Sequence, residues 1–229
     1  MKKHLLLLTT SLALATSVFA GNIGNLSEIN PTAYGKYVPT FGVKYIGQNE
    51  LGEKTYAMTF TNKYSLNRSA DNDFYLKWNI DLGYLNKTKA GYAGIGVGLG
   101  DSFRVTENSF VAIDAGYQYN TTATGDKNKP LYMKQWHTYG AELTYGYNIG
   151  DFASIGIHGH YNFNKYTLKQ SNTKLDSKTY GGGVPLSIAI GTRMNINIYG
   201  GYQTEDFDDS ATKSKKQAVG AISFSRRFN

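Results

Sequence analysis

The sequence predicts an all-β protein, a single antiparallel up-and-down transmembrane β-barrel of ten strands. Three observations carry this prediction. Apolar residues recur at every second position through most of the chain, turns and polar segments separate these stretches, and the central parts of the apolar face carry no charge. A mean hydropathy of −0.40 excludes a bundle of transmembrane helices, and the absence of Cys excludes disulfide scaffolds and thiolate chemistry.

The N-terminal segment has the pattern of a signal peptide. Two lysines precede an apolar run, and small residues occupy the −3 and −1 positions of a cleavage site between Ala20 and Gly21. The apolar run is shorter than the roughly 20 residues that a membrane anchor needs. We therefore expect three parts: a signal peptide over 1–20, a periplasmic lead-in over 21–36 and a barrel domain over 37–229.

The strand pattern is clearest from Phe74 to Tyr84, where one face is wholly apolar and the other is largely polar. Similar alternation occurs nine more times. The ten predicted strands are centred on 41–45, 56–60, 74–84, 93–99, 111–119, 139–149, 153–163, 184–190, 194–198 and 218–224. If the first pair is misassigned, the barrel has eight strands. Pro185, beside three glycines, predicts a bulge or bend in its strand.

The connections in the second half of the chain alternate in length, as the two rims of a barrel require. Residues 150–151 and 191–193 are tight turns, whereas the intervening loops are long and polar and span roughly 121–135, 165–177 and 204–215. The first half is less regular. There the segments 48–52 and 86–90 are short and the segment 65–73 is long.

The composition of the two strand faces indicates which one meets lipid. The less apolar face consists mainly of Gly, Asn, Ser, Thr and Ala with a few charges, which suits a polar lumen. A charge at mid-bilayer on the other face would cost about 2–4 kcal/mol, so its absence is what lipid exposure requires. Aromatic residues flank an aliphatic band at two levels, marked by Tyr117 and Tyr139 on one rim and by Phe74 and Phe224 on the other.

The signal peptide, the alternating strands and the ending at residues 221–229 together resemble small Gram-negative outer-membrane β-barrel proteins of the opacity-protein or porin-like type. In that group the last strand commonly ends in an aromatic residue that the barrel-assembly machinery reads. Here Phe228 is penultimate, one position from that pattern, and Phe224 precedes it. The resemblance implies a location in the cell outer membrane and contact with outer-membrane lipids, lipopolysaccharide and the barrel-assembly machinery.

Several polar residues are predicted to face the lumen. They are Lys77, Asp81, Asp114, Glu142, His158 and His160. The two histidines and Glu142 could chelate a divalent metal, but a hydrogen-bonded pair in a polar plug is the favoured interpretation. Four glycines at positions 94, 96, 98 and 100 share the lumenal face through their spacing of two. We interpret them as space for larger groups such as Tyr75, Lys77 or Asp114 rather than as a phosphate loop.

Two charged groups belong to the predicted loops. An acidic group could bind Ca²⁺ but lacks the EF-hand pattern, so a solvated loop is favoured; it comprises Glu205, Asp206, Asp208 and Asp209. A basic group predicts a positive rim that meets lipopolysaccharide phosphates rather than nucleic acid. It comprises Lys127, Lys129, Lys134, Lys165, Lys169, Lys174 and Lys178.

These patterns contain no motif for a catalytic residue, a metal or a cofactor. We therefore expect a non-enzymatic outer-membrane protein whose lumen is filled by side chains and whose surface loops act in adhesion, envelope stability or host contact. A narrow porin for small solutes is one alternative. A lipid A-modifying or hydrolytic enzyme at the lumen or rim is another, with His137 and Thr138 nearby. A soluble periplasmic barrel is the remaining alternative.

Overall fold

The computed structural model of the protein describes residues 26–31, 36–47, 54–86, 89–124, 133–168, 174–208 and 215–228. Ten strands and one short helix make up this part of the chain. They are α2 (Leu26–Ile29), β1 (Tyr37–Ile46), β2 (Thr55–Arg68), β3 (Asn72–Leu85), β4 (Ala90–Thr106), β5 (Ser109–Thr124), β6 (Met133–Ile149), β7 (Ala153–Leu168), β8 (Lys174–Ile190), β9 (Met194–Phe207) and β10 (Lys215–Arg226). The predicted signal peptide and its cleavage site at Ala20 and Gly21 lie outside the described residues.

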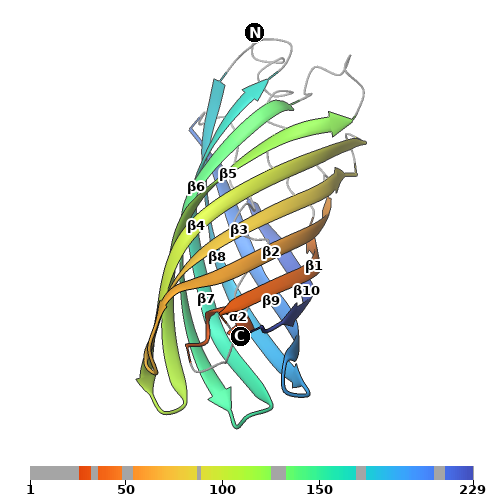
Figure 1. Cartoon of the computed structure of the whole chain (residues 1–229). Coiled ribbons are helices and arrows are strands. Elements are labelled where there is room, and N and C mark those ends of the chain that lie inside the picture. The colour runs from red at the N-terminus through yellow and green to blue at the C-terminus, as the bar shows by residue number, and fades with distance from the viewer. Residues whose placement is uncertain are drawn as a thin grey trace.

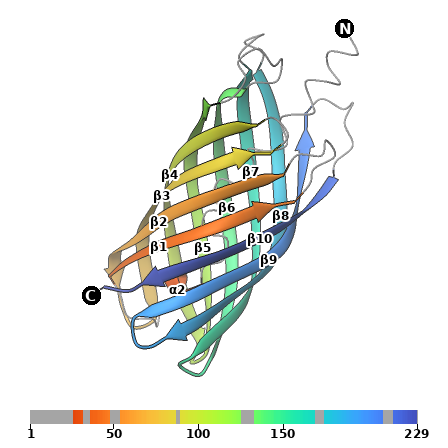
Figure 2. The same cartoon turned by 90° about the vertical axis from the view of Figure 1, so that its right-hand side faces the viewer.

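The ten strands form a closed antiparallel barrel in which each strand pairs with its neighbours in sequence (Figures 1 and 2). The barrel closes between β1 and β10, whose pairing runs from Thr40 opposite Ser225 to Ile46 opposite Val219. The predicted all-β fold and the count of ten strands are therefore confirmed. No helix in the described part of the chain is long and apolar enough to cross a membrane.

The short turns lie at the end of the barrel that also holds α2 and the last described residue, and we call this end periplasmic. Gly150 and Gly191 adopt positive φ angles of 58° and 68° in two of these turns, a backbone conformation that glycine tolerates without cost. The segment 65–73, predicted to be a long loop, forms such a turn instead. β2 continues to Arg68, and the Ser69 hydroxyl accepts the backbone N–H groups of Asp71 and Asn72.

The strands are longer than the alternation predicts. β4, β6 and β8 each have 17 residues, whereas about 9–11 suffice to cross a bilayer. Much of the sequence assigned to the three long loops is strand, because the wall continues beyond the lipid, where both faces meet water and the apolar periodicity disappears. Figures 1 and 2 show that β5 to β7 rise higher than β1, so the extracellular rim is oblique.

The outer face of the barrel is apolar. Ile157, on β7, is 68% exposed, and many aliphatic side chains of the other strands are similarly uncovered, among them Leu82, Ile95, Val97 and Leu143. Aromatic rings border this band. The ring centroids of Tyr117 and Tyr139 lie 5.4 Å apart at the extracellular border. Those of Tyr37 and Phe228 lie 6.2 Å apart at the periplasmic border. An apolar exterior around a polar interior is the arrangement of a transmembrane barrel.

The helix α2 lies inside the barrel near its periplasmic end, and it belongs to the segment predicted to be a periplasmic lead-in. Leu26 and Ile29 are buried in one cluster with Tyr75, Phe110 and Ala112. Beyond the helix, the Asn30 amide donates to Asn148 at 2.8 Å, and Arg68 donates to the carbonyl oxygen of Pro31 at 3.0 Å. The lead-in therefore contributes an apolar plug to the lumen, which its sequence did not reveal.

Pro185 lies within β8 and points into the lumen. The pairing of β7 with β8 has the same register on both sides of it, from Ile155 opposite Leu186 to His158 opposite Gly183, so the predicted bulge is absent from this ladder. Two intervening pairs are missing from the ladder, as expected because proline has no N–H to donate.

Candidate functional site: the polar interior of the barrel

The barrel interior is organised around three buried lysine–aspartate ion pairs. Lys44 on β1 lies 3.2 Å from Asp81 on β3, and Lys77 on β3 lies 2.7 Å from Asp114 on β5. Lys63 on β2 forms the third pair with Asp73 on β3, which also accepts the Ser65 hydroxyl. Buried charges are tolerated when they are paired and hydrogen-bonded, so each carboxylate offsets the desolvation of its lysine.

Tyr75 stands at the centre of this charged layer. Its side chain is fully buried, and its ring faces two ammonium groups, with Lys63 Nζ at 4.7 Å and Lys77 Nζ at 5.5 Å from the ring centroid. An aromatic face attracts cations most strongly where water is excluded. Tyr75 is therefore buried inside the barrel and contacts both lysines.

The glycines of β4 make room for this layer. A Cβ atom at Gly100 would overlap both the Tyr75 ring and the Asp114 carboxylate, which confirms the interpretation of this position as space for lumenal groups. Gly94 and Gly96 leave space for residues other than those predicted. A side chain at either position would collide with Asn120, Gln118 or Asn79. These amides lie between two of the ion pairs along β3 and β5: Asn79 donates to Gln118 at 3.0 Å, and Gln118 donates to Asp81 at 3.3 Å.

The two histidines occupy the opposite wall. His158 and His160 are buried on β7 with ring centroids 5.8 Å apart, and His158 shares a hydrogen bond of 2.9 Å with Thr144. Glu142 pairs with His160 in the ladder between β6 and β7, and the ring of Tyr199 meets His158 edge-on at 5.8 Å. No three His, Asp or Glu side chains of the described residues converge so as to hold a metal ion.

Another group of hydrogen-bonded polar side chains lies nearer the extracellular end. Thr138 donates to Asn164, and Asn164 donates in turn to the hydroxyls of Ser177 and Thr179, over distances of 2.7 to 3.1 Å. Ser177 and Tyr166 both donate to Glu205, at 2.7 and 3.0 Å. The interior is thus packed with polar side chains from α2 to the level of this group.

The position of Glu205 corrects the prediction of an acidic loop. Glu205 lies in β9 and points inward, whereas Asp206 is on the outer face of that strand and Asp208 follows it, within 3.9 Å of Lys178. Asp209 lies outside the described residues. Strand alternation places Glu205 on the face opposite to that of Asp206, and the described carboxylates form no cluster of three that could hold a metal ion.

The structure places all six predicted lumenal residues on the inner face and buries them. It brings Lys77 together with Asp114, and Glu142 beside His160, while Asp81 pairs with Lys44. Lys63, Asp73 and Tyr199 belong to the same interior but were not predicted. Continuing the inward parity of Thr59 and Thr61 by one more step would have found Lys63, had β2 not been ended at Phe60.

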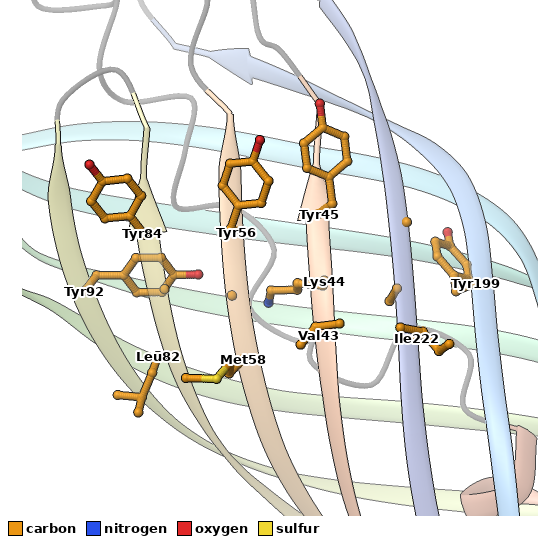
Figure 3. Close-up of a pocket in the computed structure, with 14 residues that line it drawn as sticks. Val43, Lys44, Tyr45, Tyr56, Met58, Leu82, Tyr84, Tyr92, Tyr199 and Ile222 are labelled. Atoms are coloured by element: carbon orange, nitrogen blue, oxygen red, sulfur yellow. The ribbon is translucent and has the colours of Figure 1, made fainter.

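The outer wall carries a groove of ≈ 790 Å³ across β10, β1, β2 and β3 (Figure 3). Its upper border is a row of outward tyrosines, Tyr45, Tyr56 and Tyr84, which the ladders place side by side. Its lower border is the parallel row of Ile222, Val43, Met58 and Leu82. Both rows face outward, so the groove lies on the apolar outer face of the barrel, next to the aromatic border.

Comparison with solved structures places this architecture among outer-membrane β-barrels. The translocator domain of the autotransporter NalP from Neisseria meningitidis superposes with a TM-score of 0.53 and 11% identity, over 93% of this chain and 100% of that one. An outer membrane channel from Pseudomonas putida F1 superposes with a TM-score of 0.51 and 7% identity, over 85% and 96% of the two chains. The fold is that of an outer-membrane β-barrel.

A further neighbour is the β domain of the Bordetella autotransporter BrkA, with a TM-score of 0.50 and 8% identity over 85% of this chain and 100% of that domain. No protein family model and no curated protein matches the sequence. At identities of 7–11% the likeness concerns the fold. The resemblance inferred from the sequence is confirmed at that level.

Proposed function

We propose that the protein is a non-enzymatic integral outer-membrane barrel with a closed lumen, which acts through its extracellular rim and loops in adhesion, envelope stability or host contact. The observation that carries this proposal is the filled interior. Side chains of a small barrel can occupy its whole cross-section, and the buried group of Lys63, Tyr75 and Lys77, together with the apolar contacts of α2, supports such a filling here.

The extracellular extension of the strands supports the second part of the proposal. β5 to β7 have 16 or 17 residues each, more than the roughly 9–11 that cross a bilayer, so they carry the wall beyond it. A protein that only sealed the membrane would not need this height. The extension supports a role in which the extracellular end of the barrel contacts another surface.

We also propose that the extracellular border meets anionic lipid headgroups, including lipopolysaccharide. Lys165 lies 5.9 Å above the ring of Tyr139, and Lys178 follows on the outer face of β8. Both are placed where headgroup phosphates would lie. Lys174 is likewise exposed, the side chain of Lys134 is not described, and Lys127, Lys129 and Lys169 lie outside the described residues.

The periplasmic border offers the feature that the barrel-assembly machinery is expected to use. Phe228 and Tyr37 exchange two backbone hydrogen bonds of 2.9 and 3.1 Å, which tie the end of the chain to the start of β1. Phe224 faces outward on β10. Both rings are therefore accessible on the outer face of the barrel, beside the pairing of β1 with β10 that closes it.

Single-channel recording in planar bilayers tests the closed lumen. We expect the mature protein to show no stable open conductance. A variant that lacks residues 21–31 and carries Tyr75→Ala, Lys77→Ala and Asp114→Ala should conduct, because it loses both the plug and the charged layer. Reproducible conductance by the unmodified protein would overturn the proposal in favour of a narrow porin.

Cells that display loop-shortened variants test the role of the rim. Shortening the connections 125–132 and 169–173 should reduce adhesion of the cells or raise their sensitivity to detergents. The barrel itself should stay folded, as shown by the electrophoretic mobility of unheated samples. The matched control is a variant with a shortened segment 48–53, which connects β1 to β2. Loss of lipid A modification or of hydrolysis after replacing His158, His160 and Glu142 would instead favour an enzyme.

A further inference from the structure

The periplasmic mouth of the barrel contains a polar pocket of ≈ 840 Å³. Its walls are the turns that join β4 to β5, β6 to β7 and β8 to β9, together with the residue that follows β10. Asn30, which follows α2, lines the same pocket and comes from the plug inside the barrel. This volume is within the range of sites that hold small molecules or short peptides.

Two hydrogen-bond donors in this pocket have no acceptor among the described residues. The Arg227 guanidinium donates from Nη2 to Oδ1 of Asn195 at 3.3 Å, which leaves its Nε–H and the Nδ2 group of Asn195 without partners. Asn195 is only 4% exposed, so water does not readily satisfy it. Buried donors in native proteins are nearly always paired, so these two donors are available to an acceptor on a bound ligand.

The charge of Arg227 is also uncompensated within the described residues, where no carboxylate lies within ion-pair distance of it. Burial, and to a lesser extent the nearby Arg68, lower the pKa of the Arg227 guanidinium from its ordinary value. The backbone is fixed, since the N–H of Arg227 donates to the carbonyl oxygen of Arg193 at 2.9 Å. An anionic acceptor would satisfy these donors and also compensate the charge of Arg227, and a planar carboxylate matches the adjacent guanidinium and amide donors.

The rim of the same pocket carries the opposite charge. Glu107, in the turn after β4, and Asp151, in the turn after β6, both line it. The other basic residue of the lining, Arg104, is committed to Asp71 at 3.5 Å and to the backbone carbonyl of Glu107 at 3.3 Å. A ligand that carried only negative charge would be repelled by this rim, whereas a ligand that also carried an ammonium group would be attracted.

We propose that the periplasmic pocket binds the zwitterionic end of a short peptide, with its carboxylate on Arg227 and Asn195 and its ammonium group toward Glu107 and Asp151. In the periplasm, the diamino acid of a peptidoglycan stem peptide presents this chemistry. The pocket would then anchor the barrel to the cell wall. This inference goes beyond the proposed function and requires only that this end of the barrel faces the periplasm.

Calorimetric titration of the folded mature protein in detergent tests the inference. The probe is the tripeptide L-Ala-γ-D-Glu-meso-diaminopimelate, and the comparison peptide has lysine in place of diaminopimelate, which keeps the ammonium group and removes the carboxylate beside it. We expect saturable binding of the probe and at least tenfold weaker binding of the lysine peptide. Absence of saturable binding, or equal binding of both peptides, would overturn the proposal without any mutation.

Variants then locate the site. Arg227→Gln and Asn195→Leu should each weaken binding of the probe at least tenfold. The matched control is Arg226→Gln, which removes the same charge one residue earlier, where the side chain is exposed and its guanidinium lies 4.9 Å from the outward ring of Phe228. Equal loss of binding in Arg226→Gln and Arg227→Gln would overturn the assignment. Each variant is first shown to be folded by comparing its electrophoretic mobility in unboiled and boiled samples, which differs for a folded barrel.

Discussion

Lys77 and Asp114 form an ion pair of 2.7 Å although β4 separates their strands. The pair can close because the ladders place Gly98 opposite Lys77 and Gly100 opposite Asp114. Neither glycine has a side chain that would stand between the two charged groups. The glycine pattern of β4 and the charge pattern of β3 and β5 are therefore parts of one arrangement.

The ion pair predicts strongly non-additive effects of mutation. Lys77→Met alone should lower the free energy of unfolding by about 3–5 kcal/mol, because it leaves Asp114 charged and buried without its partner. The double variant Lys77→Met/Asp114→Leu should recover most of this loss. Unfolding by urea in lipid vesicles measures all three proteins. A double variant that is no more stable than Lys77→Met alone would contradict the pairing.

The glycine at position 100 predicts a steric effect. Gly100→Val should destabilise the barrel by at least about 1–3 kcal/mol, because its side chain would displace Tyr75 or Asp114 from a filled cross-section. Gly200→Val is the matched control, since a Cβ atom there meets nothing within 4 Å. The fraction that remains folded on warming, read from electrophoretic mobility, compares the two. Equal behaviour would mean that the interior has room at Gly100.

The exposed position of Ile157 predicts a cost that depends on depth in the membrane. Ile157→Arg should destabilise the barrel by about 2–4 kcal/mol, because the side chain lies midway between the two borders of the apolar band. Thr167→Arg, on the same face of β7 but beyond Tyr161 and Phe163, should cost about 0–1 kcal/mol. The same unfolding assay in vesicles measures both. A larger loss of stability in Thr167→Arg than in Ile157→Arg would mean that the apolar band in the membrane is centred nearer Thr167.

The sequence predicted the barrel wherever lipid imposes a contrast between the two strand faces. From Phe74 to Tyr84 the contrast is complete, and β3 extends only two residues before this stretch and one residue after it. Above the aromatic border the contrast disappears, so the inward Glu205 was assigned to a loop although the structure hydrogen-bonds it to Tyr166 and Ser177. Apolar–polar alternation alone cannot predict the parts of a strand that lie beyond the membrane, where both faces meet water.

The interior was predicted in its composition but not in its pairing. Parity places Lys77, Asp81 and Asp114 on the inner face, yet it does not say that Asp81 pairs with Lys44 across β2. That choice depends on register and on the small Ala57 of β2, which lies opposite Lys44. The plug escaped prediction for a different reason, since α2 has only four residues and its apolar contacts come from distant strands.

Asn62 provides a last prediction, because it contradicts the general pattern of the outer face. It lies on the outward parity of β2, between Pro39 and Trp78 in the two ladders, and it is fully buried. Neither atom of its amide has a hydrogen-bond partner in the part of the chain that the structure describes. An unpaired buried amide costs roughly 1–3 kcal/mol by mutational measures.

Asn62→Leu should therefore stabilise the barrel by about 1 kcal/mol or more, because leucine has nearly the same size and no polar group to desolvate. The matched substitution on the inner face, Asn79→Leu, should have the opposite sign, since the Asn79 amide donates to Gln118 at 3.0 Å. Urea unfolding in vesicles compares the two variants. If Asn62→Leu destabilises the folded protein, the unpaired amide is not the net cost that this prediction assumes.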